Sequence, residues 1–436
     1  MRSRILKCAA AMTLLTALAV PFRLAAQTNY SVVELGELGG TAGSTNGINN
    51  RGWITGTDNL AGDLTTVATR WVNGKAIPLG TLLGGPNSAV AWPVKNNNGV
   101  IVGISELPDP DPTGESFSCW PFLGTGNPTG LKCQGFRWQN NQMTALPPFP
   151  GGFSSYATSV NNLGQVVGWA ENGVADPTCV NLGNNIYQVL QFRAAIWQPD
   201  GTMQELPPLP GDSTSAATAI NDLGQVVGIS GDCFIAVGFS SARHAVLWQN
   251  GVPIDLGNIG GDAWNTPTAI NNHGTIIGFA NTAPGLAKTF QAFIWTAAGG
   301  MKSLGTLPGD FRSEALGINE MGQIVGLSRG NPPPAGNAPF LIRAFLWQNG
   351  TMTDINSLAV SGSPYLLFAG DIDQQGHIVG EALDINTFDA PGFIATPVPP
   401  GAAVSSAVHA TPQGSLPKNV LRQVERRHLG DRLTSE

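Results

Sequence analysis

The feature that most constrains this chain is an eight-residue line that recurs seven times. In each copy an asparagine or aspartate opens the line, and two glycines stand four residues apart. The copies are NNRGWITG (49–56), NNNGVIVG (96–103), NNLGQVVG (161–168), NDLGQVVG (221–228), NNHGTIIG (271–278), NEMGQIVG (319–326) and DQQGHIVG (373–380). Such internal self-similarity indicates a repeat architecture, so every local motif has to be placed within this unit.

Each line predicts a tight turn between two short strands. The opening side chain can bond to the nearby backbone, and the first glycine accepts the positive φ that the turn needs. These turn glycines are Gly52, Gly99, Gly164, Gly224, Gly274, Gly322 and Gly376. The second glycine falls in or at the end of a strand, where it weakens the sheet unless another group approaches closely. We expect an adjacent strand or a tryptophan to crowd these second glycines, which are Gly56, Gly103, Gly168, Gly228, Gly278, Gly326 and Gly380.

A second line follows each turn and centres on a tryptophan in six of the seven units. The tryptophans are Trp71, Trp138, Trp197, Trp248, Trp295 and Trp347, and Ala395 takes this slot in the last unit. Asn-Gly closely follows Trp71, Trp248 and Trp347 and is a strong hairpin signal. An aliphatic residue eight or nine positions beyond each tryptophan marks a fourth strand. We expect the tryptophans to fill the core between neighbouring units.

Units of four short strands whose turn glycines lie 47 to 65 residues apart are typical of β-propeller blades. The sequence therefore predicts an all-β fold, a seven-bladed propeller of four-stranded antiparallel blades. An open β-solenoid of the same units is the alternative.

The two ends of the repeat region are complementary. SVVELGELGG (31–40) places Leu35 in the fourth-strand slot of Leu256 and Leu304, but no other strands of a unit precede it. The last unit ends in TPVPPG (396–401), whose prolines do not favour a fourth strand. We therefore expect the N-terminal strand to complete the last blade and close the ring.

The paired lines NDLGQVVG and HAVLWQNG (244–251) resemble those of HAF-type bacterial extracellular repeat proteins, a family named for a His-Ala-Phe triplet. The resemblance covers nearly the whole chain after the N-terminal segment, to about Pro397. The triplet reads His-Ala-Val at 244–246, Gln-Ala-Phe at 291–293 and Arg-Ala-Phe at 343–345. The resemblance implies an exported repeat protein, and no catalytic residues carry over from the family.

The termini differ from the repeats. A basic start, an apolar stretch over 8–20 and small residues before Gln27 have the layout of a secretory signal peptide. We expect a signal over 1–26, the propeller over 27–396, and a Pro/Gly/Ser linker with a basic tail over 397–436, disordered or a short helix. No later segment approaches the roughly 20 apolar residues of a membrane span. The sequence thus predicts a secreted or periplasmic protein, as a monomer.

Charge excludes one class of partner. Removing the signal's four basic residues leaves 18 basic against 29 acidic residues, a net charge of −11. Such a surface repels nucleic acid.

Four cysteines remain beyond the signal, which permits two disulfides in an oxidising compartment. Cys119 and Cys133 lie in one long insertion, whereas Cys179 and Cys233 lie in the corresponding insertions of the next two units. We expect Cys119 to pair with Cys133 and Cys179 with Cys233. Free or differently paired thiols are the alternative.

All large insertions fall on one face of the predicted ring, so binding is expected there, and the face of tight turns is expected to be structural. Asp212, Asp262 and Asp310 occupy the same slot of three inter-blade loops and are candidate ligand-binding residues. Candidate calcium ligands lie in LPDPDPTGE (107–115), at Asp109, Asp111 and Glu115. An ordinary Gly-Asp turn is the alternative, and no other cofactor is expected.

Catalytic signatures are missing from the sequence, which has no HExxH, GxSxG or Cys-His motif. His273 and His377 lie at the tight turns and are expected to be solvated. The sequence therefore predicts a non-catalytic binding or scaffold module whose partner is an extracellular glycan, protein or other surface component. The alternative is an extracellular polysaccharide-acting hydrolase or lyase with carboxylates at the channel mouth, because sequence does not show the separation that defines such a pair.

Overall fold

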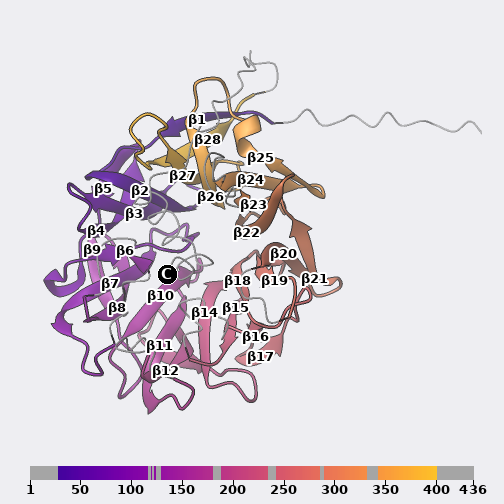
Figure 1. Ribbon diagram of the computed structural model, residues 1–436. Coiled ribbons are helices and arrows are strands. Elements are labelled where there is room, and N and C mark those ends of the chain that lie inside the picture. Colours follow the sequence, from indigo (N-terminus) through magenta and orange to yellow (C-terminus); the bar gives the residue numbers. More distant parts are fainter. Residues whose placement is uncertain are drawn as a thin grey trace, which may run out of the picture.

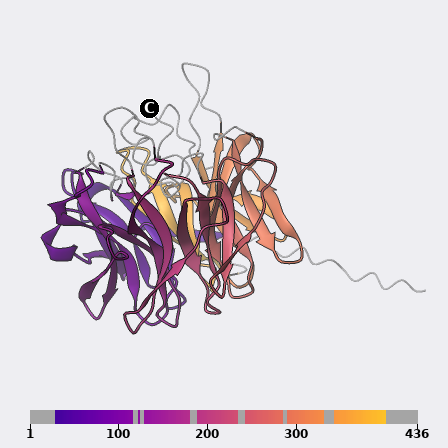
Figure 2. The same ribbon diagram turned by 90° about the horizontal axis from the view of Figure 1, so that it is seen from below.

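A computed structural model describes residues 28–399, apart from 116–118, 120–121, 124–128, 180–187, 234–241, 285–288 and 331–341. These residues form seven four-stranded antiparallel sheets, arranged as blades around a central axis (Figure 1). Figure 2 shows the same ring turned by 90°. The predicted seven-bladed propeller is confirmed. The expected signal peptide, and the expected tail beyond residue 399, lie outside the described residues.

Blades 1 to 4 follow one another along the chain. Blade 1 contains β2 (Gly39–Ile48), β3 (Ile54–Leu60), β4 (Thr66–Val72) and β5 (Lys75–Pro78). Blade 2 contains β6 (Ser88–Ala89), β7 (Ile101–Pro110), β8 (Leu131–Gln139) and β9 (Gln142–Leu146), after a short 3-10 helix at Leu82–Gly84. Blade 3 contains β10 (Ser155–Val160), β11 (Val166–Ala175), β12 (Leu190–Trp197) and β13 (Met203–Leu206). Blade 4 contains β14 (Thr214–Ile220), β15 (Val226–Gly231), β16 (His244–Gln249) and β17 (Val252–Asp255).

The remaining blades complete the ring. Blade 5 contains β18 (Asn265–Ile270), β19 (Ile276–Asn281), β20 (Phe290–Thr296) and β21 (Gly300–Gly305). Blade 6 contains β22 (Asp310–Ile318), β23 (Ile324–Gly330), β24 (Ile342–Gln348) and β25 (Thr351–Asp354), followed by a 3-10 helix at Ile355–Ser357. Blade 7 contains β26 (Tyr365–Ile372), β27 (Ile378–Leu383), β28 (Gly392–Pro397) and the N-terminal strand β1 (Tyr30–Glu34). Among the described residues, no helix has the length and apolar character of a membrane span.

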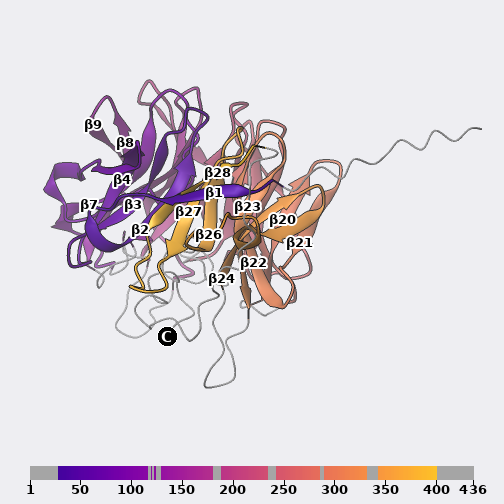
Figure 3. The same cartoon turned by 90° about the horizontal axis from the view of Figure 1, so that it is seen from above.

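The N-terminal strand closes the ring, as expected. β1 runs antiparallel to β28, with Val32 opposite Ala395 and Glu34 opposite Phe393 (Figure 3). Beyond the strand, Leu35 donates its backbone N–H to the carbonyl of Gly392 at 2.8 Å and is buried. No blade is therefore left with three strands, and the sheet edge of β28 is covered.

The two glycines of each repeat line meet different constraints. The turn glycines have φ between +73° and +82°, a region that side-chain-bearing residues rarely adopt. The second glycines are crowded by backbone, because an added Cβ would lie 1.8 to 2.2 Å from a carbonyl oxygen of the innermost strand. At Gly168 this oxygen belongs to Tyr156, and at Gly103 to Ala89. In each copy the nearest crowding group is thus a strand backbone, rather than a tryptophan.

Tryptophans join consecutive blades. The indole N–H of Trp197 donates to the carbonyl of Pro147 at 2.9 Å, and that of Trp248 donates to Pro207 at 2.7 Å. Each acceptor is the residue directly after the outermost strand of the preceding blade. Trp138 and Trp197 also share one hydrophobic cluster. The indoles of Trp197 and Trp248 therefore both fill the space between blades and supply a hydrogen bond across it.

Candidate functional site

Two disulfides brace the loop-bearing face, defined here as the side of the ring with the connections between second and third strands and between successive blades. Cys119 pairs with Cys133, which lies in β8 of blade 2. Cys179 of blade 3 pairs with Cys233 of blade 4, across 54 residues of sequence. Both expected disulfides are therefore present, and the second ties two blades together.

Side-chain hydrogen bonds reinforce the junction of blades 3 and 4. Oδ2 of Asp176 accepts from the hydroxyls of Ser213 at 2.8 Å and Thr214 at 2.7 Å. Thr178 Oγ1 accepts the backbone N–H of Cys233 at 3.0 Å. Burial opposes ionisation, but hydrogen bonds from Thr178, Thr214 and Ser213 together hold the pKa of Asp176 below its usual range. An ionised Asp176 thus clamps the two blades.

A buried carboxylate also links blades 2 and 3. Glu115, in the loop after β7, accepts backbone N–H groups of Val189 at 2.6 Å and Leu190 at 3.3 Å through Oε1. Leu190 begins β12 of blade 3. The loop of blade 2 is therefore anchored on the neighbouring blade.

Two of the three candidate calcium ligands converge with a third carboxylate that sequence reasoning missed. One carboxylate oxygen each from Asp111, Glu115 and Glu171 lies within 4.8 Å of the others. Glu171 belongs to β11 of blade 3. Asp109 does not join them, because its exposed side chain lies 3.2 Å from Lys132 Nζ. We refer to Asp111, Glu115 and Glu171 as the acidic cluster.

In each member of the acidic cluster, one carboxylate oxygen accepts hydrogen bonds from the described residues and the other does not. Oδ1 of Asp111 accepts from Thr113, and Oε2 of Glu171 accepts backbone N–H groups of Phe153 at 2.7 Å and Ser154 at 3.0 Å. The other oxygens are buried and have no hydrogen-bond partner among the described residues, namely Asp111 Oδ2, Glu115 Oε2 and Glu171 Oε1. Buried acceptors without a donor are rare and costly, so this arrangement needs an explanation.

Burial dominates the electrostatics of the acidic cluster. Burial, followed by the charge of Glu171, raises the pKa of Glu115 well above its usual range. Burial raises the pKa of Glu171 to about 7, against the hydrogen bonds from Phe153 and Ser154. Three carboxylates in this space cannot all stay ionised at neutral pH unless a positive charge joins them.

The candidate ligand-binding aspartates lie at three successive inter-blade connections, where Asp310 is the first residue of β22. Asp212 Oδ1 lies 3.1 Å from Arg243 Nη2, and Asp310 Oδ1 lies 2.8 Å from Arg343 Nη2. Both carboxylates are almost fully buried, at 5% and 3% side-chain exposure, whereas Asp262 is exposed. Asp212 and Asp310 are thus already engaged by arginines, Arg243 directly before β16 and Arg343 in β24.

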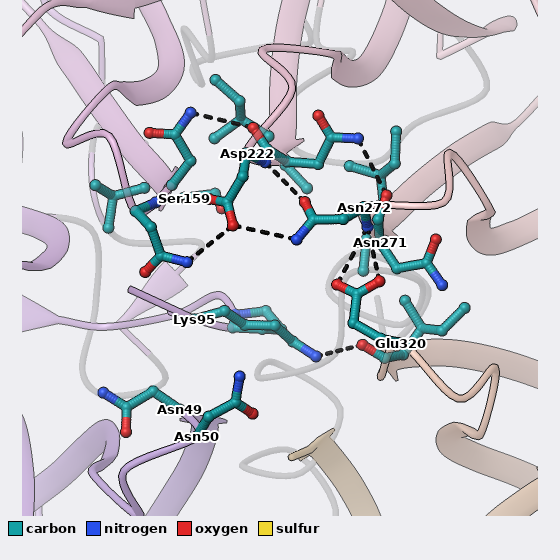
Figure 4. Close-up of a pocket in the computed structure, with 18 of the residues that line it drawn as sticks. Asn49, Asn50, Lys95, Ser159, Asp222, Asn271, Asn272 and Glu320 are labelled. Atoms are coloured by element: carbon teal, nitrogen blue, oxygen red, sulfur yellow. Dashed lines mark hydrogen bonds between the residues drawn. The ribbon is translucent and has the colours of Figure 1, made fainter. Parts of the chain in front are cut away.

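The opposite face is held by a closed ring of hydrogen bonds. The second residue of each repeat line donates its backbone N–H to the side-chain oxygen of its counterpart in the next blade, at 2.7 to 3.2 Å. The ring consists of Asn50, Asn97, Asn162, Asp222, Asn272, Glu320 and Gln374. Gln374 returns to Asn50 Oδ1 at 3.1 Å. We call this set the amide ring, and Figure 4 shows part of it.

A second ring lies beside the amide ring but stops at the last blade. The opening asparagine of each line donates its Nδ2 to the carbonyl of the next opening residue, at 2.6 to 3.2 Å for six successive blades. The seventh opening residue is Asp373, whose carboxylate side chain has no N–H to donate. Its Oδ2 lies 2.7 Å from His377 Nδ1 instead. His377 thus has a carboxylate partner in the turn, while His273 Nδ1 lies 3.1 Å from Glu320 Oε2.

Two residues in the channel break the repeat, and sequence reasoning missed both. Lys95 directly precedes its repeat line, where the other six copies have isoleucine or valine. Asp371 stands two residues before its line, where the others have Gly, Val, Ser or Ala. Lys95 Nζ reaches past blade 1 to Asp371 Oδ1 of blade 7 at 2.9 Å, and it also donates to the carbonyl of Ile318 in blade 6. Aligning the seven copies would have singled out both positions.

A pocket with both polar and apolar lining opens at this end of the channel. It offers about 720 Å³ of space, including solvent at its mouth, and is lined by strand ends and the amide ring. Figure 4 shows Lys95 reaching across it. Asp222 and Glu320 both contact Asn272, which donates Nδ2 to Asp222 Oδ2 at 3.1 Å and its backbone N–H to Glu320 Oε2 at 3.0 Å. The carboxylates at this mouth therefore serve as acceptors within the ring.

No family model matches this chain, and no curated protein matches it. Solved structures with a similar fold include Pyrococcus horikoshii acylaminoacyl peptidase (11% identity, TM-score 0.45, 84% of this chain and 54% of that one). This chain thus spans about half of that protein. Others are the β-propeller domain of the Trilobed protease from Pyrococcus furiosus (9%, 0.42, 88% and 98%) and virginiamycin B lyase from Staphylococcus aureus (11%, 0.45, 85% and 100%). Likeness at this level does not bear on activity.

Proposed function

We propose that this chain is an exported, non-catalytic binding or scaffold module, and that it engages an extracellular glycan or surface protein through the loop-bearing face of blades 2 to 4. The recurring lines further support a place among HAF-type extracellular repeat proteins. Both proposals concern the mature chain.

The observation that carries the proposed function is the cross-bracing of that face. The Cys179–Cys233 disulfide and the hydroxyl contacts of Asp176 join blades 3 and 4, and Glu115 joins blades 2 and 3. Loops that are fixed before binding lose little conformational entropy when a partner arrives. The disulfide stabilises the fold, and together with these contacts it also gives a recognition surface a fixed shape before a partner binds.

The direct test is a binding screen of the mature protein against extracellular polysaccharides and cell-surface proteins. We expect at least one class to bind. Replacing Cys179 and Cys233 together by serine is expected to weaken this binding while the protein still melts cooperatively. Glu320→Gln, on the opposite face, serves as the matched control and is expected to bind normally. Binding that is lost in Glu320→Gln and kept in the cysteine variant would contradict the proposed face.

A polysaccharide-acting hydrolase or lyase is the alternative, and the same polysaccharides test it. New reducing ends or unsaturated sugars after incubation would establish cleavage. If cleavage were then abolished by Asp222→Asn or Glu320→Gln, the activity would be placed at the channel mouth, and the non-catalytic proposal would be wrong.

A further inference from the structure

We propose that the acidic cluster is a Ca²⁺ site that joins the loop of blade 2 to β11 of blade 3. The inference rests on the geometry of Asp111, Glu115 and Glu171, and it does not depend on the identity of any ligand of the loop-bearing face.

Convergence of buried, unpartnered oxygens is the first argument. Asp111 is 6% exposed, and Glu115 and Glu171 are fully buried. Each carboxylate is fixed in place by hydrogen bonds to one oxygen, and each keeps a second buried oxygen without a donor among the described residues. One carboxylate oxygen from each of the three lies within 4.8 Å of the others. Carboxylates that bind a metal ion are commonly oriented in this way, because hydrogen bonds hold one oxygen and leave the other for the ion.

Blade 3 provides an internal comparison for Asp111. The sequence Asp-Pro-Thr occurs at 111–113 and again at 176–178, and in both places the threonine donates its N–H to the aspartate Oδ1 at 2.8 Å. Oδ2 of Asp176 receives two hydroxyl donors from blade 4, whereas Oδ2 of Asp111 receives none from the described residues of blade 3. At the junction of blades 3 and 4 the second oxygen of the aspartate faces hydroxyl donors. At the junction of blades 2 and 3 the equivalent aspartate lies beside two further carboxylates.

Blade 2 provides the comparison for Glu171. Glu106 stands at the same distance from its strand glycine, three residues after Gly103 as Glu171 is after Gly168. Both oxygens of Glu106 have partners, Asn87 Nδ2 at 2.7 Å and the hydroxyl of Thr129. A buried glutamate at this strand position therefore has donors for both oxygens in blade 2, whereas in blade 3 only one of its oxygens has donors among the described residues.

The chemistry of the oxygens favours Ca²⁺. The acidic cluster holds carboxylates without cysteine or histidine, and hard cations prefer such ligands. Ca²⁺ binds oxygens at about 2.3–2.6 Å, and carboxylate oxygens that lie within 4.8 Å of one another are close enough to share one ion after small side-chain adjustments. Mg²⁺ demands near-ideal octahedral geometry and keeps several of its waters, whereas Ca²⁺ accepts about six to eight oxygens in flexible geometry, which suits several buried carboxylates at one site. Water and backbone carbonyls would supply the further ligands of a six- to eight-coordinate ion.

Calorimetric titration of the chelator-treated mature protein with CaCl₂ tests the site. We expect uptake of one Ca²⁺ per chain and a higher melting temperature in Ca²⁺ than in EDTA. Glu171→Gln keeps the shape of the side chain and removes its charge, so it is expected to weaken Ca²⁺ binding by about tenfold or more. Asp176→Asn alters the equivalent turn and is expected to bind Ca²⁺ like the wild type.

Three outcomes would overturn the proposal. These are wild-type protein that takes up no Ca²⁺, Glu171→Gln protein that binds it as tightly as the wild type, and binding of Mg²⁺ in preference to Ca²⁺. Because the titration contains no glycan or partner protein, its failure is distinguishable from failure of the proposed function. The wild-type titration also stays decisive if a variant fails to fold.

Discussion

Lys95 Nζ lies 2.9 Å from Asp371 Oδ1, and this ion pair links the two positions at which the channel departs from the repeat. Asp371 is fully buried, and burial raises its pKa, although Lys95 and the backbone N–H of Ile48 act in the opposite direction. A lysine in blade 2 and an aspartate in blade 7 thus compensate each other. Removing either residue leaves the charge of the other without its ion-pair partner.

Substitutions at this pair should show a marked asymmetry. Lys95→Ile leaves a buried carboxylate unpaired and is expected to lower the free energy of unfolding by about 3 kcal/mol. Asp371→Ala should cost less, because the Lys95 side chain is 36% exposed and can turn to solvent. Urea denaturation monitored by tryptophan fluorescence provides the measurement.

The double variant Lys95→Ile/Asp371→Ala is the control for this prediction. It restores at both positions the residue types that the other blades use, so it should unfold within about 1 kcal/mol of the wild type. A double variant that loses the sum of the two single effects would show that the ion pair is not what couples these residues.

The two glycines of one repeat line should differ in their tolerance of alanine. A Cβ on Gly326 would lie 1.9 Å from the carbonyl oxygen of Glu314, so Gly326→Ala should destabilise the protein by about 3 kcal/mol or more. Gly322 has φ of +76° and open space around it, and Gly322→Ala should cost only about 1–2 kcal/mol. Thermal melting of the two variants compares them, and equal losses would contradict the crowding argument.

Deleting 31–36 should destabilise the whole ring. The deletion removes most of β1 and the buried Leu35, and it leaves the edge of β28 without a partner. We expect a lower melting temperature and self-association through the open edge, which light scattering detects. Val33→Ala, at a side chain that is 57% exposed, is the matched control and should change little. Melting unchanged by the deletion would mean that closure does not stabilise the ring.

The acidic cluster should make stability depend on pH in the absence of metal. Because the pKa of Glu171 is raised from 4.5 to about 7 on folding, the folded state holds a proton that the unfolded chain releases. Stability in EDTA should therefore fall as the pH rises from about 4.5 to 7, by at most about 3 kcal/mol from this group. Melting temperatures across this range provide the measurement.

Two comparisons isolate the contribution of Glu171. Burial and nearby carboxylates also raise the pKa of Glu37 to about 7, so only the difference between wild type and Glu171→Gln is informative. Glu171→Gln should flatten the profile, and Ca²⁺ should do the same for the wild type by holding the cluster ionised. A wild-type profile that matches the Glu171→Gln profile in EDTA would contradict the buried-proton argument.

The sequence alone determined the architecture, because its information is local and repeated. Each of the seven turn glycines requires a positive φ, and tryptophans in six of the seven units pack against the preceding blade, so the seven turns specify seven blades. Leu35 occupies a fourth-strand slot without the strands that should precede it, and this predicts closure by β1. The cysteine pairs could likewise be predicted from the insertions that carry them.

The tertiary structure decided which residues from different blades meet. Glu171 joins Asp111 and Glu115 because the neighbouring blades face each other at that level of the ring, and no short sequence pattern encodes the distance. Lys95 and Asp371 lie far apart in the sequence and come together only when the ring closes. Turn and strand formation depends on local conformation and periodicity, whereas these contacts depend on how the blades pack around the axis.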